Sequence, residues 1–86
     1  MGLDSVELVM SFEDEFEIEI PNSVAEKMIT PGDVTDFVCA EFKRLGRKCD
    51  PLDIFLRVRK RTVEITNVDP DRITRSTKFV DDLGID

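Results

Sequence analysis

The fold is decided first by residues 4–16, which read DSVELVMSFEDEF. Val9, Phe12 and Phe16 recur in this stretch at steps of three and four residues, the spacing that puts side chains on one face of a helix. The acidic residues between them fall off that apolar stripe and face water. The pattern therefore predicts an amphipathic helix over about 4–17.

The rest of the chain also follows helical spacing for most of its length. Residues 17–20 alternate like a strand, but a proline ends the run and no second run is available to pair with it, so an extended connector is expected. A short helix after Asn22 is followed by helices over about 31–45 and 51–66. Residues 67–84 form a long irregular stretch, which in a compact domain carries a function or a short helical turn. The sequence therefore predicts an all-α fold with three principal helices and one short helix.

The apolar faces of these helices define the expected core. It consists of Leu8, Val9, Phe12, Phe16, Ile20, Val34, Phe37, Val38, Phe55, Phe79 and Leu83. The inward side of the helix over 51–66 is expected to carry Leu52, Phe55, Val58, Thr62 and Ile65, with the basic side chains at 57 and 59–61 covering the rest. Residues 46–50, which are polar and bounded by glycine and proline, are predicted to form a linker.

Length and composition describe one soluble globular domain. The 86 residues are 41% apolar and 36% charged, and no apolar run reaches the roughly 20 residues of a membrane-spanning helix, so membrane insertion is not expected. The formal charge of −7 divides into −10 for residues 1–42 and +3 for residues 43–86. Such an acidic half repels nucleic acid and favours basic protein partners, although ordinary solvated helix surface explains it equally well.

Few residues of this chain could support catalysis or hold a metal. There is no histidine, and Cys39 and Cys49 have neither metal-ligand nor redox-motif spacing, so ordinary thiols and no metal site are expected. The sequence has no nucleophile–histidine pair, paired acid and base, or phosphate-binding glycine loop, so neither catalytic residues nor an enzyme are expected. The first residues show no leader, which favours a cytoplasmic location, or an organelle if a targeting segment has been removed.

Two segments of the chain resemble acyl carrier proteins. Residues 6–27 are similar, without a gap, to the family's second helix, the loop after it and the third helix. Residues 68–86, which begin with VDPD and end with FVDDLGID, resemble the long first loop that leads into the family's Asp-Ser-Leu motif. Together with the helices over 31–45 and 51–66, the likeness covers nearly the whole chain. It implies one carrier domain over 1–86 with an acyl-carrier-like helical bundle.

The two segments stand in the opposite order to that of the family. Residues 1–45 resemble its second to fourth helices, and residues 51–86 resemble its first helix and long loop. The chain is therefore similar to a circularly permuted carrier, whose original ends are joined by the linker 46–50 and whose new ends are cut at the modified site. A closed monomer is one outcome of that order, and a dimer that swaps segments between two chains is the other.

The resemblance implies a carrier that holds acyl intermediates as thioesters on a serine-linked 4'-phosphopantetheine arm. It implies delivery of those intermediates to basic-faced acyl-transfer and synthase enzymes of fatty acid or related lipid or polyketide synthesis, and modification by a phosphopantetheinyl transferase. No nucleic acid partner is implied. The alternative is an inactive or engineered carrier scaffold that lacks the attachment serine and acts only as a protein-interaction module.

The attachment site has two candidate positions. If residues 2–5, which read GLDS, match the family motif, Ser5 bears the arm and Asp4 takes the family's role of positioning metal and coenzyme A. If Asp86 is instead placed before residue 3, the family register is restored, but the modified serine then falls at the break, where the chain has only a methionine and a glycine. A hydroxyl at a helix N-terminus suits a phosphodiester, because the free N–H groups there attract the anion. Taken alone, the Asp-Ser pair is more simply a helix N-cap.

The resemblance also implies a surface that faces partner enzymes. It is formed by Glu7, Met10, Glu13 and Asp14. Acids opposite a basic patch speed encounter and orient docking, and a methionine adds an adaptable apolar contact. Ordinary solvated surface is the alternative for each of them. The basic run at 57–61 departs from the family, which often has aliphatic residues at the positions of Arg61 and Thr62, and this departure predicts looser core packing along that helix.

Overall fold

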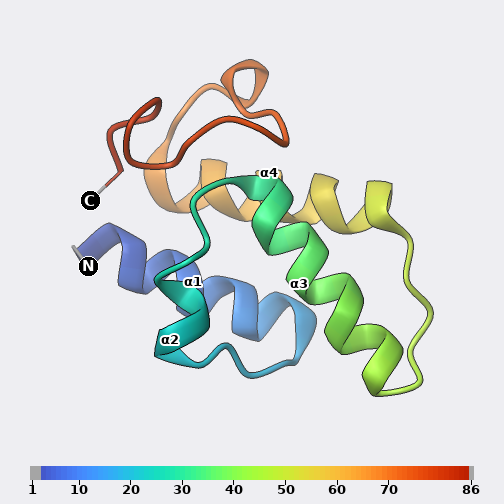
Figure 1. The fold of residues 1–86 in the computed structure, drawn as a ribbon. Helices are drawn as coiled ribbons and strands as arrows, with labels where there is room; N and C mark the ends of the chain where they lie inside the picture. Colours follow the sequence, from blue (N-terminus) through green and yellow to red (C-terminus); the bar gives the residue numbers. More distant parts are fainter. Residues whose placement is uncertain (1–2, 86) are drawn as a thin grey trace.

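A computed structural model describes residues 3–85 of the chain as a bundle of helices (Figure 1). In chain order the elements are α1 (Leu3–Phe16), α2 (Asn22–Ala25), α3 (Pro31–Arg44), α4 (Pro51–Thr66) and a 3-10 turn, η1 (Pro70–Arg72). Residues 3–85 contain no strand, so the predicted all-α fold with three principal helices and one short helix is confirmed. Within the same residues, no helix combines the length and the apolar character needed to cross a membrane.

The helices predicted over about 31–45 and 51–66 each begin at a residue whose side chain caps the first turn. Thr30 caps α3 through a reciprocal pair of hydrogen bonds: its hydroxyl accepts from Asp33 N–H at 3.1 Å, and the Asp33 carboxylate accepts from Thr30 N–H at 3.1 Å. Asp50 caps α4 by accepting from Leu52 N–H at 3.2 Å. Gly46 ends the turn after α3 with a positive φ of 73°, a conformation that costs glycine little.

Helix α4 packs against both α1 and α3, and the core lies where the three helices meet. The ring of Phe16 meets that of Phe42 edge to face, with 6.1 Å between the ring centroids. Among the predicted core residues, those buried are Leu8, Phe12, Phe16, Ile20, Val34, Val38 and Phe79. Three more pack against the cluster while partly exposed: Val9, Phe37 and Leu83. Phe55 is the exception, because it is half-buried and outside the core cluster.

The inward face of α4 is rotated from the predicted one. Its buried residues are Ile54, Val58 and Thr62, whereas Leu52 is 67% exposed, so the predicted inward position of Leu52 is wrong. Thr62 is fully buried, and its hydroxyl donates to the carbonyl oxygen of Val58 at 2.8 Å. Since its one polar group is satisfied, a threonine is accommodated in the core at this position, and looser packing along the rest of α4 stays a prediction.

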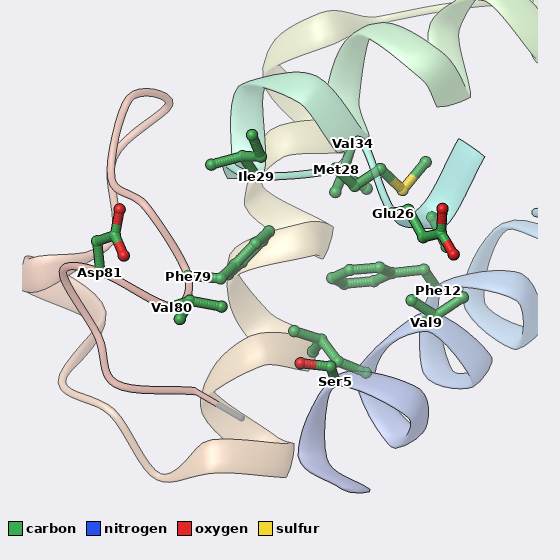
Figure 2. Close-up of a pocket in the computed structure, with 12 residues that line it drawn as sticks. Ser5, Val9, Phe12, Glu26, Met28, Ile29, Val34, Phe79, Val80 and Asp81 are labelled. Carbon is green, nitrogen blue, oxygen red and sulfur yellow. The ribbon is translucent and has the colours of Figure 1, made fainter. Parts of the chain in front are cut away.

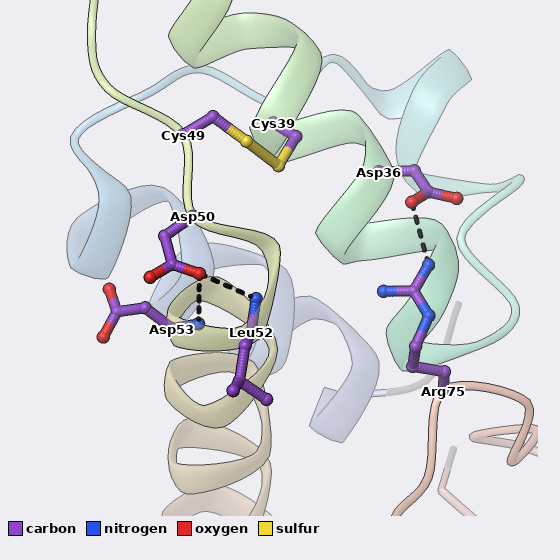
Figure 3. The surroundings of a disulfide bond; sticks show 7 residues. All are labelled: Asp36, Cys39, Cys49, Asp50, Leu52, Asp53 and Arg75. Atoms are coloured by element: carbon purple, nitrogen blue, oxygen red, sulfur yellow. Dashed lines mark hydrogen bonds and ion pairs between the residues drawn. A yellow bond between two sulfur atoms is a disulfide. The ribbon is translucent and has the colours of Figure 1, made fainter.

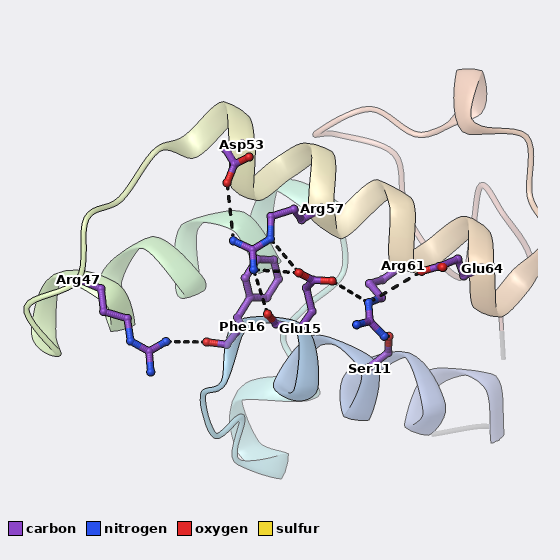
Figure 4. A network of polar contacts seen from close by, with 8 residues as sticks. All are labelled: Ser11, Glu15, Phe16, Arg47, Asp53, Arg57, Arg61 and Glu64. Atoms are coloured by element: carbon purple, nitrogen blue, oxygen red, sulfur yellow. Dashed lines mark hydrogen bonds and ion pairs between the residues drawn. The ribbon is translucent and has the colours of Figure 1, made fainter.

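Two arginines of α4 pack on α1 and hold its last turn (Figure 4). Arg57 Nε and Arg61 Nε each donate to a different oxygen of the Glu15 carboxylate at 2.8 Å. Arg57 also donates to the Glu15 carbonyl oxygen at 2.9 Å, and its guanidinium lies 4.7 Å from the centroid of the Phe16 ring. The hydrogen bond from Arg61, with that from Arg57, lowers the pKa of Glu15 from its ordinary value of 4.5. These arginines join the two helices and do not merely cover the surface of α4.

The two cysteines form a disulfide (Figure 3). Cys39 on α3 is bonded to Cys49 in the linker, with 5.4 Å between the Cα atoms. The prediction of ordinary thiols is therefore wrong. The linker turns back along the last turns of α3 before α4 begins, and this reversal brings together two residues ten positions apart.

The segment after η1 returns across the start of α3 to the beginning of α1 (Figure 1). Gly32 N–H donates to the Arg75 carbonyl oxygen at 2.9 Å, and Phe79 N–H donates to the Ile29 carbonyl oxygen at 2.9 Å. Ile73, Phe79 and Ile85 are buried along it. The described start and end of the chain consequently lie on the same side of one molecule.

Candidate functional site

An apolar pocket of about 290 Å³ opens between the first turns of α1 and the returning C-terminal segment (Figure 2). Its lining is Ser5, Leu8, Val9, Phe12, Ala25, Glu26, Met28, Ile29, Val34, Phe79, Val80 and Asp81. We call it the serine pocket. Among the described residues, the charged ones that line it are Glu26 and Asp81, both exposed at the surface. Within the described residues, no group of three histidine, cysteine, aspartate or glutamate side chains is arranged to hold a metal ion.

Both ends of the sequence build this pocket. Ser5 and Leu8 come from the first turns of α1, and Phe79, Val80 and Asp81 come from the last residues described (Figure 2). The two segments are more than seventy positions apart in the sequence, yet they line one space within a single chain. The pocket therefore exists only when the C-terminal segment closes over the start of α1.

Ser5 lies in the first turn of α1, at the pocket mouth. Because the helix begins at Leu3, Asp4 and Ser5 are already inside it, and the reading of either one as the N-cap is wrong. Ser5 is half-buried, and its spacing from Leu8 and Phe12 puts all three on the pocket side of the helix. Asp4 is exposed to solvent. The alternative attachment position, between Asp86 and Gly2, lies outside the described residues.

The outer face of α1 presents most of the predicted partner-facing residues. Glu7 and Asp14 are exposed, and Met10 is 61% exposed. Glu13 differs from them, because it is half-buried and its carboxylate accepts a hydrogen bond from Ile20 N–H at 2.8 Å. Glu13 thus fixes the connector after α1, a role that sequence reasoning missed. Docking of partners on this face stays a prediction.

Comparison with known proteins gives one kind of match. No protein-family model matches the chain, and no solved structure matches it. Among the curated proteins that match is an acyl carrier protein from Picosynechococcus sp., 56% identical over 37 residues. The match covers 43% of this chain and 46% of that protein, so it spans less than half of the relative's length.

The match confirms the acyl-carrier resemblance over those residues. The name of the matched protein is that of a carrier, in agreement with the prediction that the chain is not an enzyme. The helical fold agrees with an acyl-carrier-like bundle. The rotated order of the segments is not tested by the match and stays a prediction.

Proposed function

From this similarity to an acyl carrier protein, we propose that the chain holds acyl groups as thioesters on a 4'-phosphopantetheine arm linked to Ser5. It presents them to enzymes of fatty acid synthesis or of related lipid or polyketide synthesis. The observation that carries the proposal is the Ser5 hydroxyl, which lies in the first turn of α1 at the mouth of an apolar pocket.

The surroundings of Ser5 fit a phosphodiester-linked arm. The first N–H groups of a helix lack partners within the helix, and they form its positive end. A phosphodiester on a first-turn hydroxyl is stabilised there without a basic side chain. Ser5 is half-buried, so its hydroxyl is reachable at the surface while its neighbours lead inward. When bound, the arm supplies a terminal thiol that bears the acyl group as a thioester.

The serine pocket supplies shelter for a small acyl group. Phe12 and Val34 are almost fully buried, and Phe79 is 6% exposed, so the inner walls are apolar. A volume of about 290 Å³ lies at the lower end of the roughly 300–1,000 Å³ typical of ligand pockets. Such walls would exclude water from the thioester of a short acyl chain, and a longer chain would extend past the mouth.

The outer face of α1 is proposed to recruit the partner enzymes and the transferase. Glu7 and Asp14 are exposed acids that would steer basic-faced partners, and Met10 between them offers an apolar contact. The face begins within one turn of Ser5, so a docked enzyme would lie beside the arm.

The permuted order and the location belong to the same proposal. A pocket lined by both ends of the chain, and a match to less than half of a relative, are what a rotated carrier sequence would give. A cytoplasmic location is also proposed; because cytosolic thiols are kept reduced, it requires the Cys39–Cys49 disulfide of the structure to be open there.

Intact-mass measurement after incubation with coenzyme A and a broad-specificity phosphopantetheinyl transferase tests the proposal. The wild type should gain the mass of one phosphopantetheine. The gain should disappear in Ser5→Ala and persist in Ser23→Ala, a control at an exposed serine outside the pocket. A gain that persists in Ser5→Ala would assign the arm to another residue.

The alternative function is an interaction scaffold that lacks the attachment serine. It is favoured if the wild type gains no mass and the variant Gly2→Ser gains one phosphopantetheine. That variant places a hydroxyl at the position where the family register, restored with Asp86 before residue 3, puts the modified serine.

A further inference from the structure

A second hollow lies on the side of the molecule formed by α3, α4 and the disulfide (Figure 3). It is an open groove of about 980 Å³, lined by Asp36, Cys39, Ala40, Lys43, Cys49, Pro51, Leu52, Phe55, Arg59, Ile73, Thr74 and Arg75. We call it the basic groove. None of its lining residues comes from α1.

The basic groove combines apolar surface with unbalanced positive charge. Leu52 is 67% exposed, and Phe55 lies half-buried with the Arg59 guanidinium 5.9 Å from its ring centroid. Arg75 is paired with Asp36 at 2.9 Å, but no ion pair within residues 3–85 involves Lys43 or Arg59. A large exposed leucine beside two uncompensated cations fits a helix that carries both apolar and acidic residues.

The outer face of α1 has that composition. Val6 is 42% exposed and Met10 is 61% exposed, one helical turn apart. Glu7 and Asp14 are exposed acids on the same helix. The chain therefore carries two complementary surfaces that lie on different elements.

We propose that the outer face of α1 of one copy docks in the basic groove of a second copy. Val6 and Met10 would cover Leu52, and the acids would compensate the groove's cations. Since the surfaces differ, the contact joins copies either head to tail or twice across a two-fold axis. The net charge of −7 on each copy opposes association, so the complex is weak.

Sedimentation velocity of the unmodified chain over a range of concentrations tests this proposal. At about 0.1 M salt the Debye length is about 10 Å, which screens distant charges more than contacts inside the groove. The average mass should rise above the 9.8 kDa of one chain as concentration increases. Glu7→Lys with Asp14→Lys, or Lys43→Gln with Arg59→Gln, should each weaken association by about tenfold or more.

Two matched controls make the same charge changes at residues outside the two proposed surfaces. Glu17→Lys with Glu19→Lys alters exposed acids outside α1, and Lys48→Gln with Lys60→Gln alters exposed cations outside the groove lining. Neither control should weaken association by as much as tenfold. Ser5→Ala should also associate normally, because the contact does not depend on the proposed arm, so this test and that of the proposed function fail separately.

Mixing the two surface variants is the sharper experiment. The α1 variant keeps an intact groove, and the groove variant keeps an intact α1, so only one productive contact is possible between them. The mixture should form a 1:1 complex of twice the mass of one chain, although each variant alone associates about tenfold or more weakly than the wild type. A wild type that stays monomeric, a mixture that does not associate, or association that survives in both variants would overturn the proposal.

Discussion

The serine pocket and the basic groove are hollows of opposite kinds. The pocket interrupts the core: Phe12 is 1% exposed, and the charged side chains that residues 3–85 place at its rim are acidic. The groove lies on the surface: Leu52 is 67% exposed, and its uncompensated charges are basic. The pocket therefore depends on the closure of both chain ends, whereas the groove depends on the pairing of α3 with α4 and on residues 73–75 beside them. The two should respond differently to substitution.

Removing one aromatic side chain from the lining of each hollow should give the largest difference in the free energy of unfolding. Phe12→Ala removes a buried ring from the core and should lower the free energy of unfolding by about 3–5 kcal/mol. Phe55→Ala removes a half-buried ring at the groove and should cost about 1 kcal/mol. Urea unfolding followed by circular dichroism measures both. Equal losses would break the distinction between a core pocket and a surface groove.

Reducing the disulfide beside the groove should have the next largest effect on the stability of the protein. The Cys39–Cys49 bond closes a loop of ten residues, and opening it should lower the free energy of unfolding by about 2–3 kcal/mol. The measurement compares urea midpoints with and without a dithiol reductant. The variant Cys39→Ser with Cys49→Ser should have the urea midpoint of the reduced wild type, and the reductant should not change that midpoint. An unchanged midpoint in the wild type would show that the bond contributes nothing.

The contact between α3 and the segment after η1 should be sensitive to substitution of Gly32. The segment after η1 lines the groove with Arg75 and the pocket with Phe79. It contacts α3 at Gly32, where an added Cβ would lie 2.7 Å from the Arg75 carbonyl oxygen. Gly32→Ala should therefore destabilise the protein by about 1–3 kcal/mol. Replacing a glycine inside a helix by alanine ordinarily raises the free energy of unfolding by up to about 1 kcal/mol. A stabilised Gly32→Ala variant would therefore contradict the close approach.

The hydrogen bonds from Arg57 and Arg61 to Glu15 should make the free energy of unfolding depend on pH without altering either hollow. The pKa of Glu15 is lowered in the folded state, so its contribution is present above its unfolded pKa and is lost as pH falls through the folded pKa. Glu15→Gln should lower the free energy of unfolding by about 1–2 kcal/mol at neutral pH. The variant should also lose less stability than the wild type as pH falls below about 4.5. If the free energy of unfolding falls equally with pH in the wild type and in Glu15→Gln, this role of Glu15 is contradicted.

Helix positions and most of the core followed from local sequence. The prolines near the starts of α3 and α4 and the spacing of Phe12 and Phe16 act within one helix, so no knowledge of the fold was needed. The face of α4 did not follow, because apolar residues occur on several sides of that helix. Its rotation is tied to the pairing of Arg57 and Arg61 with Glu15, a contact across more than forty residues.

The candidate site was predictable in part. Ser5 and the exposed Glu7 and Met10 came from the family resemblance, but the structural role of Glu13 depends on where the connector to Ile20 runs. The disulfide depends in the same way on the reversal of the linker. Both features require backbone geometry that spacing along the chain does not contain.

The central claim is that both ends of one chain close the serine pocket. Isotope-filtered nuclear Overhauser measurements on a mixture of labelled and unlabelled chain test it most directly. We expect contacts between Phe79 and the pocket side of α1 within each labelled molecule, including Phe12. If those contacts occur only between labelled and unlabelled molecules, as in a segment-swapped dimer, or are missing, the claim is wrong.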